Sequence, residues 1–524
     1  MTVAAGLDIG NATTEVVLGR LGGAVPEILA YDRVPTRGMK GSPSSVDGAV
    51  RLVRRLEREC GQVVDVASVA PLRPVTTRAV ALPEPTVHTG RLRLVRAGSG
   101  TAGGHGTAVA PPFAVGTGAG IPGAPVVAVV PRDQGYAGAL PELRRLAEHG
   151  VLAGVVLGRD EAVLVANRLG VPVPVVDEVA TAPALAAQLL AVEVRGAGQL
   201  LRLLTDPVRL AAELKLEPAE RAGAVRLAGL LADRSNAVVA LDATAPPEPP
   251  APAPWTPPYP VDDLYTVDLG ALADGVLARA GSLRSRAVVL AELRADGVAD
   301  PAPALADLLG RPVRTAPSEA GAARIGGLST PGAELDAAVV DLGGGTIDVV
   351  TGDGSVVVAG AGELLTVAAA GLLGTTRAAA EWAKRGPAYR VEGARILLGE
   401  DGSRTFLEGP LGTDAVGALV TAGPGGWLPF HRSLAPGEWR ALRLRLKAVV
   451  LGGNVARALH GLARVPSTVV VVGGPAGDDE VLACVARELP DGTAVGRGNA
   501  AGILGHRFAV AYGLLIASDD SGST

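Results

Sequence analysis

The residues from Asp341 to Thr346 form the pattern in this chain whose chemistry is easiest to infer. Asp341 precedes three glycines, Gly343, Gly344 and Gly345, and Thr346 follows them. Glycines let backbone N–H groups approach an anion closely because no Cβ atom stands in the way. Thr346 adds a hydroxyl donor, and a carboxylate such as Asp341 can hold the hydration shell of a Mg²⁺ ion that neutralises a phosphate. These residues therefore indicate a site for a phosphate and its magnesium ion.

Two further stretches carry a similar combination of residue types. Near the N-terminus an aspartate is followed by a glycine, an asparagine and two threonines. Near the C-terminus two glycines and a proline follow an apolar run. Both stretches can supply backbone N–H groups at a turn, and the first also supplies a carboxylate and hydroxyls. The residues are Asp8, Gly10, Asn11, Thr13 and Thr14 in the first stretch, and Gly473, Gly474 and Pro475 in the second.

Short apolar runs flank these residues and predict the strands that position them. Residues 338–342 and 346–350 predict a β-hairpin whose tip is the glycine run, and residues 3–9 lead into a second hairpin of the same design. Residues 468–472 predict a buried strand that ends in the late glycine turn. Taken alone, the hairpin at Asp341 is also compatible with an ordinary glycine-rich turn, because short glycine motifs are weak evidence.

The three elements in this order resemble the superfamily of sugar kinases, seventy-kilodalton heat-shock chaperones and actin. In that superfamily two hairpins bind the nucleotide phosphates from opposite sides, and the late glycine turn lies against the adenosine. The resemblance implies an α/β fold of the actin-like (ribonuclease H-like) type, a two-lobed ATPase with ATP or ADP and Mg²⁺ as cofactors. It implies that Asp8 and Asp341 are catalytic, and that the glycines, asparagine, threonines and proline named above bind the nucleotide.

The middle of the chain predicts a separate α/β domain. Residues 126–130, 151–157 and 173–176 predict short strands, and residues 140–149 and 161–169 predict the helices between them. Strands that alternate with helices pair in parallel through right-handed crossovers.

Asp160 and Asp177 each follow one of these predicted strands. Residues just past the carboxyl ends of parallel strands converge on one edge of the sheet, so the two carboxylates could share a divalent cation. The alternative is that each aspartate caps the helix that follows it. The spacing by itself favours the capping interpretation.

Composition and charge exclude several classes of protein. The net charge of −5 gives no electrostatic reason to expect binding to nucleic acid or to an anionic membrane. Cys60 and Cys484 form no motif, which argues against a disulfide scaffold or an iron–sulfur cluster and fits a reducing cytoplasm. Residues 97–131 lack charged side chains, but 14 of these 35 residues are glycine or proline, so a membrane-spanning helix is not expected.

The domain organisation follows from these patterns. We expect the first part of the ATPase in residues 1–81, an inserted α/β domain in 82–240, a linker in 241–262 and the rest of the ATPase in 263–524. Nine of the fifteen residues from Pro246 to Pro260 are proline, which indicates an extended spacer.

Two further features lie beyond the second hairpin. Gly360–Glu363 opens a predicted helix whose N-terminus could face a phosphate. Arg443 and Lys447 lie four residues apart within the helical region 439–462 and share one helix face. A solvated basic face is the favoured interpretation of this pair, over a contact with adenosine.

Several segments narrow the resemblance to one family. The most specific is Gly154–Val179, which contains Gly158-Arg159-Asp160-Glu161 and Val175-Val176-Asp177-Glu178. This segment is similar to the large subunit of diol and glycerol dehydratase reactivating factors. The other similar segments are residues 6–15, 233–239, 359–363 and 495–499.

This resemblance implies a specific activity. The actin-like ATPase would carry an inserted swivelling β/β/α domain and pair with a small subunit in an α₂β₂ heterotetramer. It would use ATP to expel damaged cobalamin from an inactivated adenosylcobalamin-dependent dehydratase. Asp160, Asp177 and Thr101 would hold a divalent cation together with a glutamate of the small subunit, which reverses the preference for capping.

Other activities on the same ATPase core remain possible at this point. A carbohydrate kinase needs a catalytic base aimed at a substrate hydroxyl, and no second motif supplies one. A general heat-shock chaperone or a filament-forming protein would use the same hairpins, but the chain ends shortly after the late glycine turn. A divergent reactivase with a different client is a further alternative.

Overall fold

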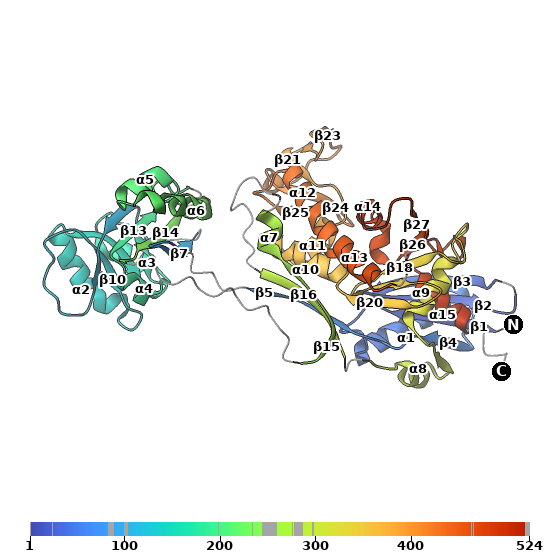
Figure 1. The fold of residues 1–524 in the computed structure, drawn as a ribbon. Coiled ribbons are helices and arrows are strands. Elements are labelled where there is room, and N and C mark those ends of the chain that lie inside the picture. The colour runs from blue at the N-terminus through green and yellow to red at the C-terminus, as the bar shows by residue number, and fades with distance from the viewer. Residues whose placement is uncertain are drawn as a thin grey trace. The chain divides into compact units, whose positions relative to one another are not determined.

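A computed structural model describes residues 2–23, 25–81, 88–98, 103–196, 199–232, 234–243, 259–274, 276, 287–295, 298–462, 464 and 466–518 (Figure 1). The chain forms two compact units. The larger unit runs from β1 (Val3–Ile9) to β5 (Val75–Ala81) and from β15 (Val261–Asp268) to α15 (Ala509–Ala517). The smaller unit runs from β6 (His88–Thr89) to β14 (Asn236–Leu241).

The first sheet of the larger unit has the strand order β17-β4-β1-β2-β3. Strands β1, β2 and β3 form two successive antiparallel pairs, whereas β4 and β17 run parallel to β1. Helix α1 packs its buried apolar side chains on this sheet. It begins after Ser42, whose hydroxyl accepts a hydrogen bond from the Ser45 N–H, and it ends at Gly61. The elements are β2 (Thr13–Arg20), β3 (Glu27–Pro35), β4 (Val66–Val69), β17 (Val313–Thr315) and α1 (Pro43–Cys60).

The second sheet of the larger unit has the strand order β20-β19-β18-β26-β27. Strands β18, β19 and β20 again form two successive antiparallel pairs, whereas β26 and β27 run parallel to β18. Strand β18 is buried along its whole length, as its apolar sequence predicts. The strands are β18 (Ala338–Leu342), β19 (Thr346–Val350), β20 (Ser355–Ala359), β26 (Thr468–Val472) and β27 (Ala494–Arg497).

The two sheets therefore share one topology. Strands β3, β2, β1, β4 and β17 of the first sheet correspond in order and direction to β20, β19, β18, β26 and β27 of the second. This arrangement, repeated in two halves, is the ribonuclease H-like fold of an actin-like ATPase. The fold class expected from the sequence is confirmed.

Helices α9 (Glu319–Leu328) and α15 pack tightly against each other between the two halves (Figure 1). Small residues permit this close approach. A Cβ atom on Gly326 would lie 1.8 Å from the carbonyl oxygen of Ala509, and one on Gly513 would lie 1.9 Å from that of Ala322. A Cβ atom on Gly6 would likewise lie 1.9 Å from the carbonyl oxygen of Ala511, so α15 also lies directly on β1.

The remaining elements of the larger unit form two antiparallel sheets and several helices. The sheet orders are β15-β16-β5 and β23-β22-β21-β24-β25. The strands are β16 (Ala287–Arg294), β21 (Tyr389–Gly393), β22 (Ile396–Leu398), β23 (Arg404–Phe406), β24 (Leu419–Gly423) and β25 (Gly426–His431). The helices are α7 (Leu269–Asp274), α8 (Ala302–Leu309), α10 (Gly362–Leu373), α11 (Arg377–Ala383), α12 (Pro436–Lys447), α13 (Gly453–His460) and α14 (Asp479–Arg487).

The smaller unit is built in layers of two helices, a parallel sheet, an antiparallel sheet and two more helices. The parallel sheet has the order β12-β11-β10-β9 and packs on α2 and α3 through one apolar core. The antiparallel sheet, β6-β7-β14-β13-β8, packs on the parallel sheet through a second core and on α5 and α6 through a third. The strands are β7 (Leu92–Gly98), β8 (Gly106–Ala110), β9 (Pro112–Ala114), β10 (Val126–Val130), β11 (Leu152–Leu157), β12 (Val175–Val176) and β13 (Leu189–Val194). The helices are α2 (Gly135–Glu148), α3 (Ala162–Leu169), α4 (Thr181–Leu185), α5 (Pro207–Glu213) and α6 (Arg221–Leu231).

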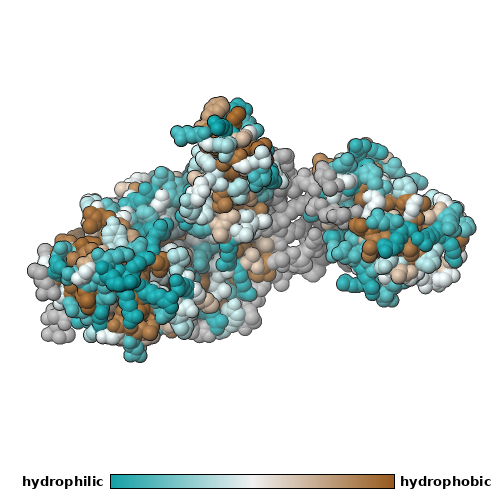
Figure 2. All heavy atoms as spheres, turned by 180° about the vertical axis from the view of Figure 1, so that it is seen from behind, coloured by the Kyte–Doolittle hydropathy of each residue, from teal (hydrophilic) through white to brown (hydrophobic). Residues whose placement is uncertain are grey.

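Hydrophilic and hydrophobic residues are interspersed over the face of the molecule that Figure 2 presents. None of the helices in the described ranges combines the length and the apolar character needed to cross a bilayer. The predicted proline spacer lies outside the described residues, except for Tyr259 and Pro260.

Candidate functional site

The two predicted hairpins have matching geometry at their tips. The Gly10 N–H donates to the carbonyl oxygen of Thr13 at 2.9 Å, and the Gly343 N–H donates to that of Thr346 at 3.0 Å. In each hairpin an acidic residue on the first strand lies directly opposite an acidic residue on the second. These cross-strand pairs are Asp8 with Glu15 and Asp341 with Asp348.

The second tip is fixed by backbone hydrogen bonds from the start of α10. Each of its three glycine carbonyls accepts one N–H: Gly343 from Gly362 at 3.1 Å, Gly344 from Glu363 at 2.8 Å and Gly345 from Gly360 at 2.7 Å. The N–H groups of Gly360 and of the first two residues of α10 therefore support the glycine turn, whereas the sequence had suggested that this helix start could face a phosphate.

The first tip is fixed mainly by side chains. The Asn11 amide donates to the carbonyl oxygen of Val75 at 2.7 Å, and the Thr36 hydroxyl donates to that of Gly10 at 2.8 Å. The hydroxyl of Thr14 lies 3.0 Å from the hydroxyl of Thr36. These bonds attach the tip to the segment that follows β3 and to the start of β5.

The two tips lie against each other. A Cβ atom on Gly344 would lie 2.9 Å from both the backbone nitrogen and the Cβ of Ala12. One on Gly345 would lie 2.8 Å from Cγ of Asn11 and from Cβ of Val75. Glycine is therefore required at these positions by the approach of the opposite hairpin, in addition to any role in binding an anion.

The late glycine turn meets the second hairpin. Gly473 has a φ angle of +87°, which favours glycine, and a Cβ atom there would lie 2.4 Å from Oδ1 of Asp341. Gly474 faces the guanidinium group of Arg507, and Pro475 lies 3.3 Å from the position of a Cβ atom on Gly362. All three predicted glycine turns are thus brought together in the larger unit.

Several backbone N–H groups at the two tips have no hydrogen-bond acceptor among the residues that the structure describes. Within the described ranges no partner is found for the N–H groups of Asn11, Ala12, Gly344 and Gly345. Successive unpaired N–H groups at a turn form a favourable site for an anion. This is the chemistry that the sequence predicted for these positions.

Four carboxylates lie beside these tips, Asp8 half-buried and the other three buried, and their pKa values are raised. Burial raises the pKa of Asp341 well above its ordinary value, and the carboxylates of Asp348 and Glu319 raise it further. Burial has the same effect on Asp8, again reinforced by Glu319 and then by Glu15. Burial also raises the pKa of Glu15 and of Asp348 to about 7. So many carboxylates in one buried place favour a cation.

Lys40 and Glu319 form an ion pair at the same place. The Nζ atom of Lys40 lies 2.6 Å from Oε2 of Glu319, and the lysine is buried. Burial lowers the pKa of Lys40, but the carboxylates of Glu319 and Asp8 outweigh this and hold the pKa above its ordinary value. Lys40 comes from the segment between β3 and α1, and Glu319 is the first residue of α9, so the pair joins elements far apart in sequence.

The donor set fits a hydrated divalent cation beside a phosphate. Oδ1 of Asp348 is buried and has no hydrogen-bond partner in the part of the chain that the structure describes. An unpaired buried carboxylate oxygen is costly unless a ligand compensates it. Asp8 and Asp341 supply further oxygen atoms of the kind that Mg²⁺ prefers, here through water, because within the described ranges no three such side chains converge to hold a metal directly.

Sequence reasoning missed four residues of this cluster. Glu15 and Asp348 carried a signal, because each follows the aspartate of its hairpin at the same spacing. Lys40 and Glu319 carried none, since neither stands in a motif and only the fold brings them to the hairpins.

The interpretation of Arg443 and Lys447 as a solvated basic face was wrong. Both side chains are buried. Arg443 bonds to Glu400 and to Glu480, and Nζ of Lys447 lies 2.5 Å from Oδ2 of Asp478 and 2.6 Å from Oε2 of Glu480. The pair forms a buried ion network that joins α12 to α14, because two charged side chains on an inward helix face are tolerated only with such partners.

Asp160 and Asp177 lie at the carboxyl ends of β11 and β12, on one edge of the parallel sheet. Oδ2 of Asp177 accepts the N–H of Ala162 at 2.9 Å, so it caps α3, the helix that precedes it in the chain. Neither aspartate caps the helix that follows it, which corrects the capping alternative. Burial raises the pKa of Asp177, opposed by the Ala162 N–H and reinforced by the charge of Asp160.

The third predicted cation ligand of this domain, Thr101, lies outside the described residues. Gly103, at the start of the next described segment, exchanges two backbone hydrogen bonds with Val175 in β12. No group of three or more acidic, histidine or cysteine side chains suited to a metal occurs within the described ranges. Two carboxylates alone are too few for a complete site, so a cation here would need further ligands.

Comparison with known proteins identifies the two units. Residues 260–518 match the family model described as the diol dehydratase reactivase ATPase-like domain, and residues 96–244 match that of the DD-reactivating factor swiveling domain. The diol dehydratase-reactivating factor large subunit of Klebsiella michiganensis is 28% identical over 98% of each chain. The propanediol dehydratase-reactivating factor large subunit of Citrobacter freundii is also 28% identical over 98% of each chain.

Solved structures agree with these matches. A diol dehydratase-reactivating factor in nucleotide-free form has a TM-score of 0.57 and 26% sequence identity, and the match covers 99% of this chain and 100% of that one. A glycerol dehydratase reactivase has a TM-score of 0.58 and 25% identity at the same coverage. The resemblance inferred from the sequence is confirmed. The chain belongs to the family of diol dehydratase-reactivating factor large subunits, with an actin-like ATPase-like domain and a swivelling domain.

Proposed function

We propose that this chain hydrolyses ATP and couples the hydrolysis to the release of damaged cobalamin from an inactivated adenosylcobalamin-dependent diol or glycerol dehydratase. The observation that carries the proposal is similarity to reactivating factor large subunits along 98% of the chain, including both of its domains.

The nucleotide site of the proposal is the meeting point of the three glycine turns. The phosphates would lie against the two tips at Gly10, Asn11, Gly343, Gly344 and Gly345. The N–H groups of Asn11, Gly344 and Gly345 would donate to them, because those of Gly10 and Gly343 already close the hairpins. Hydroxyls would come from the threonines at the start of the second strands, and the turn from Gly473 to Pro475 would contact the adenosine. These threonines are Thr13, Thr14 and Thr346.

Asp8 and Asp341 would hold the hydration shell of a Mg²⁺ ion. When bound, this ion neutralises the phosphate oxygens that gain charge during hydrolysis. The buried ammonium group of Lys40 lies in the same cluster, and its ion pair with Glu319 fixes its position. The free carboxylate oxygen of Asp348 supports the assignment of a cation to this cluster.

The swivelling domain would join the large subunit to a small one in an α₂β₂ assembly. Asp160, Asp177 and Thr101 would share a divalent cation with a glutamate of the small subunit. Nucleotide state would then change how tightly the two subunits bind, because ATP and ADP can drive a cycle only if they favour different partners.

A reconstitution assay tests the proposal. The purified chain, the co-expressed small subunit and a dehydratase inactivated with cyanocobalamin are mixed with Mg²⁺, ATP and fresh adenosylcobalamin, and recovered dehydratase activity is measured. We expect recovery with ATP, little recovery without it, and little with the Asp341→Asn variant. Equal recovery with and without ATP would refute the coupling.

A second measurement addresses the swivelling-domain cation. The Asp160→Asn/Asp177→Asn variant should bind the small subunit at least about tenfold more weakly, since it loses both carboxylates offered to the shared ion. Nucleotide binding by the same variant serves as its control. Unchanged subunit affinity would remove the shared cation from the proposal.

A further inference from the structure

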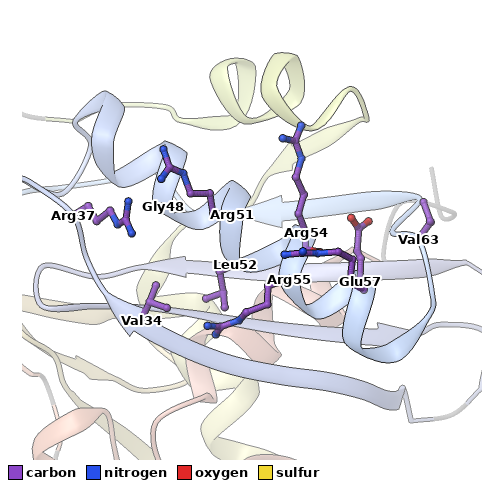
Figure 3. A pocket seen from close by; sticks show the side chains of 10 residues that line it. Val34, Arg37, Gly48, Arg51, Leu52, Arg54, Arg55, Glu57 and Val63 are labelled. Carbon is purple, nitrogen blue, oxygen red and sulfur yellow. The ribbon is translucent and has the colours of Figure 1, made fainter.

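The outer side of α1 carries an open hollow of about 710 Å³ that is separate from the carboxylate cluster described above (Figure 3). Five of the ten residues that line it are arginines, whereas the whole chain has a net charge of −5. The arginines are Arg37, Arg51, Arg54, Arg55 and Arg58. Such a volume lies within the range of ligand-binding cavities.

The pattern of the helix explains this concentration of charge. Arginines at positions 51, 54, 55 and 58 follow the helical spacing that places side chains on one stripe. The opposite side of α1 is buried against the sheet through residues such as Val53 and Leu56, so the arginine stripe is turned outward. The fifth arginine, Arg37, lies across α1, with its Cγ and Cδ 3.9 Å from the position of a Cβ atom on Gly48.

Much of this positive charge has no carboxylate partner in the described part of the chain. Within the described ranges Arg51 pairs with Asp47, and Arg55 pairs with Asp32 and Glu59. Glu57, the carboxylate that lines the hollow, is paired with Arg311, which lies outside the lining.

The other three arginines have no carboxylate partner within the same ranges. Arg54 donates to the carbonyl oxygen of Leu308 at 2.6 Å, and Arg58 donates to that of Arg54 at 3.2 Å. All three of these side chains, including Arg37, belong to exposed residues. The hollow therefore offers uncompensated guanidinium groups to solvent.

The directions of the side chains favour an extended anion over a compact one. In Figure 3, Arg51 and Arg54 point to the side of α1 where α8 lies, whereas Arg55 points to the other side, beside Val34. A single phosphate is bound by guanidinium groups that converge on one point. Groups held apart along a helix instead match carboxylates spaced along a chain.

Apolar side chains beside the arginines indicate what else the ligand carries. Val34, Leu52 and Val63 also line the hollow; Leu52 is buried, so the accessible apolar surface comes from the half-buried Val34 and from Val63, which is 62% exposed. An apolar side chain flanked by carboxylates would cover this surface and meet the arginines around it. We propose that the hollow is a docking site for an acidic, extended segment of a partner protein that carries one apolar anchor residue.

The dimensions define a probe for this proposal. Arg51 and Arg58 are separated by about 10 Å along the helix axis, which three or four extended residues span. A panel of fluorescein-labelled peptides of about eight residues, with aspartates and glutamates at varied spacings around one leucine, therefore covers the arrangement. Binding of the full chain to these peptides is measured by fluorescence anisotropy. We expect saturable binding of at least one peptide, weakened as NaCl rises from about 50 to about 300 mM.

Two charge-reversal variants distinguish the site from general electrostatic attraction. Arg54→Glu/Arg58→Glu should weaken binding at least about tenfold. Arg221→Glu/Arg226→Glu on α6 changes the net charge equally at two exposed arginines and should leave binding unchanged. Thermal unfolding of both variants shows whether each is folded, and a single Arg58→Ala variant replaces the first if it is not.

Three outcomes would overturn the proposal: no peptide binds, both charge-reversal variants weaken binding alike, or leucine-free peptides bind as well as the others. Displacement of the peptides by low concentrations of pyrophosphate would also overturn it, because the site would then be one for a compact phosphate.

Discussion

The two hairpins of the larger unit have the same strand geometry but are fixed by different means. Both begin in the first strand of a sheet with the same topology, and both carry a cross-strand acidic pair. The first tip is attached through the side chains of Asn11 and Thr36, whereas the second tip consists of glycines whose carbonyls accept N–H groups from Gly360–Glu363. A side chain on the second tip would collide with the first, so only one of the two tips can carry side chains.

This difference shows which features of the hairpins the site needs on both sides. The glycine that starts each tip, the hydroxyl residue that follows it and the acidic pair are shared. The residues between the glycine and the hydroxyl residue differ, because each tip is hydrogen-bonded to different neighbouring segments. The following predictions test whether the two halves of the site are as equivalent in function as they are in geometry.

The largest effect should follow the loss of either first-strand aspartate. Asp8→Asn and Asp341→Asn should each lower kcat for ATP hydrolysis by about 100-fold or more, since each removes a negative charge from the proposed magnesium site. If both act on one ion, the double variant should lose little more than either single variant. The measurement is steady-state phosphate release, with thermal unfolding as the test of folding.

The exposed Asp353, in the turn after β19, provides a matched control for these variants. Asp353→Asn should leave kcat unchanged. If only one of the two hairpin aspartates matters, or if their effects multiply, the idea of one shared ion would be wrong.

Contact between the tips should be sensitive to a single methyl group on the second tip. Gly344→Ala should lower the free energy of unfolding by about 1–3 kcal/mol, because its Cβ atom would meet the backbone of Ala12. Gly354→Ala is the control, since a Cβ atom there meets nothing within 4 Å. Chemical denaturation measures both. Equal stability of the two variants would mean that the tips do not lie in contact.

Glu15 and Asp348, the acidic residues on the second strand of each hairpin, should make the free energy of unfolding depend on pH. Their pKa values of about 7 exceed the ordinary values of 4.5 for Glu15 and 3.8 for Asp348 because of burial. Groups with raised pKa values bind protons in the folded state that they lose in the unfolded state, so their contribution is complete below about pH 4 and is lost as the pH rises through 7. The free energy of unfolding of the metal-free protein should therefore fall by about 2 kcal/mol for each of the two groups, about 4 kcal/mol together, between pH 5 and 7.

Two changes should reduce this fall. The Asp348→Asn variant lacks one of the titrating groups, and Mg²⁺ with nucleotide would keep the carboxylates ionised in the folded state. Urea denaturation at a series of pH values measures both effects, with Asp353→Asn as the control. An identical pH dependence of Asp348→Asn and the unaltered chain would show that Asp348 is ionised throughout this range.

The smallest effect should come from the side-chain attachment of the first tip. Asn11→Ala should lower the free energy of unfolding by about 1 kcal/mol, since it removes the donor to the carbonyl oxygen of Val75. Asn11→Asp should cost at least as much, because a carboxylate has the same shape but cannot donate. Two variants as stable as the unaltered chain would show that this bond contributes nothing to fixing the tip.

The sequence determined the local features of this protein. Glycines, aspartates and β-branched runs mark the strands and tips of both hairpins, because turn chemistry and alternation depend on neighbouring residues. Strands of the parallel sheet, at residues 126–130, 151–157 and 173–176, were predicted for the same reason. Likeness of several segments to one family then predicted the actin-like fold and the swivelling domain, which the comparisons confirmed.

Only the tertiary structure decided which distant residues join the site. Lys40 and Glu319 stand in no motif, and they meet because α9 and the segment before α1 both converge on the hairpins. Arg443 and Lys447 were interpreted as solvated because helical spacing shows that two residues share a face but not what covers that face. In the fold α14 packs there, and its Glu480 forms ion pairs with both side chains. The closeness of the two tips likewise depends on the packing of the two halves, which no local pattern encodes.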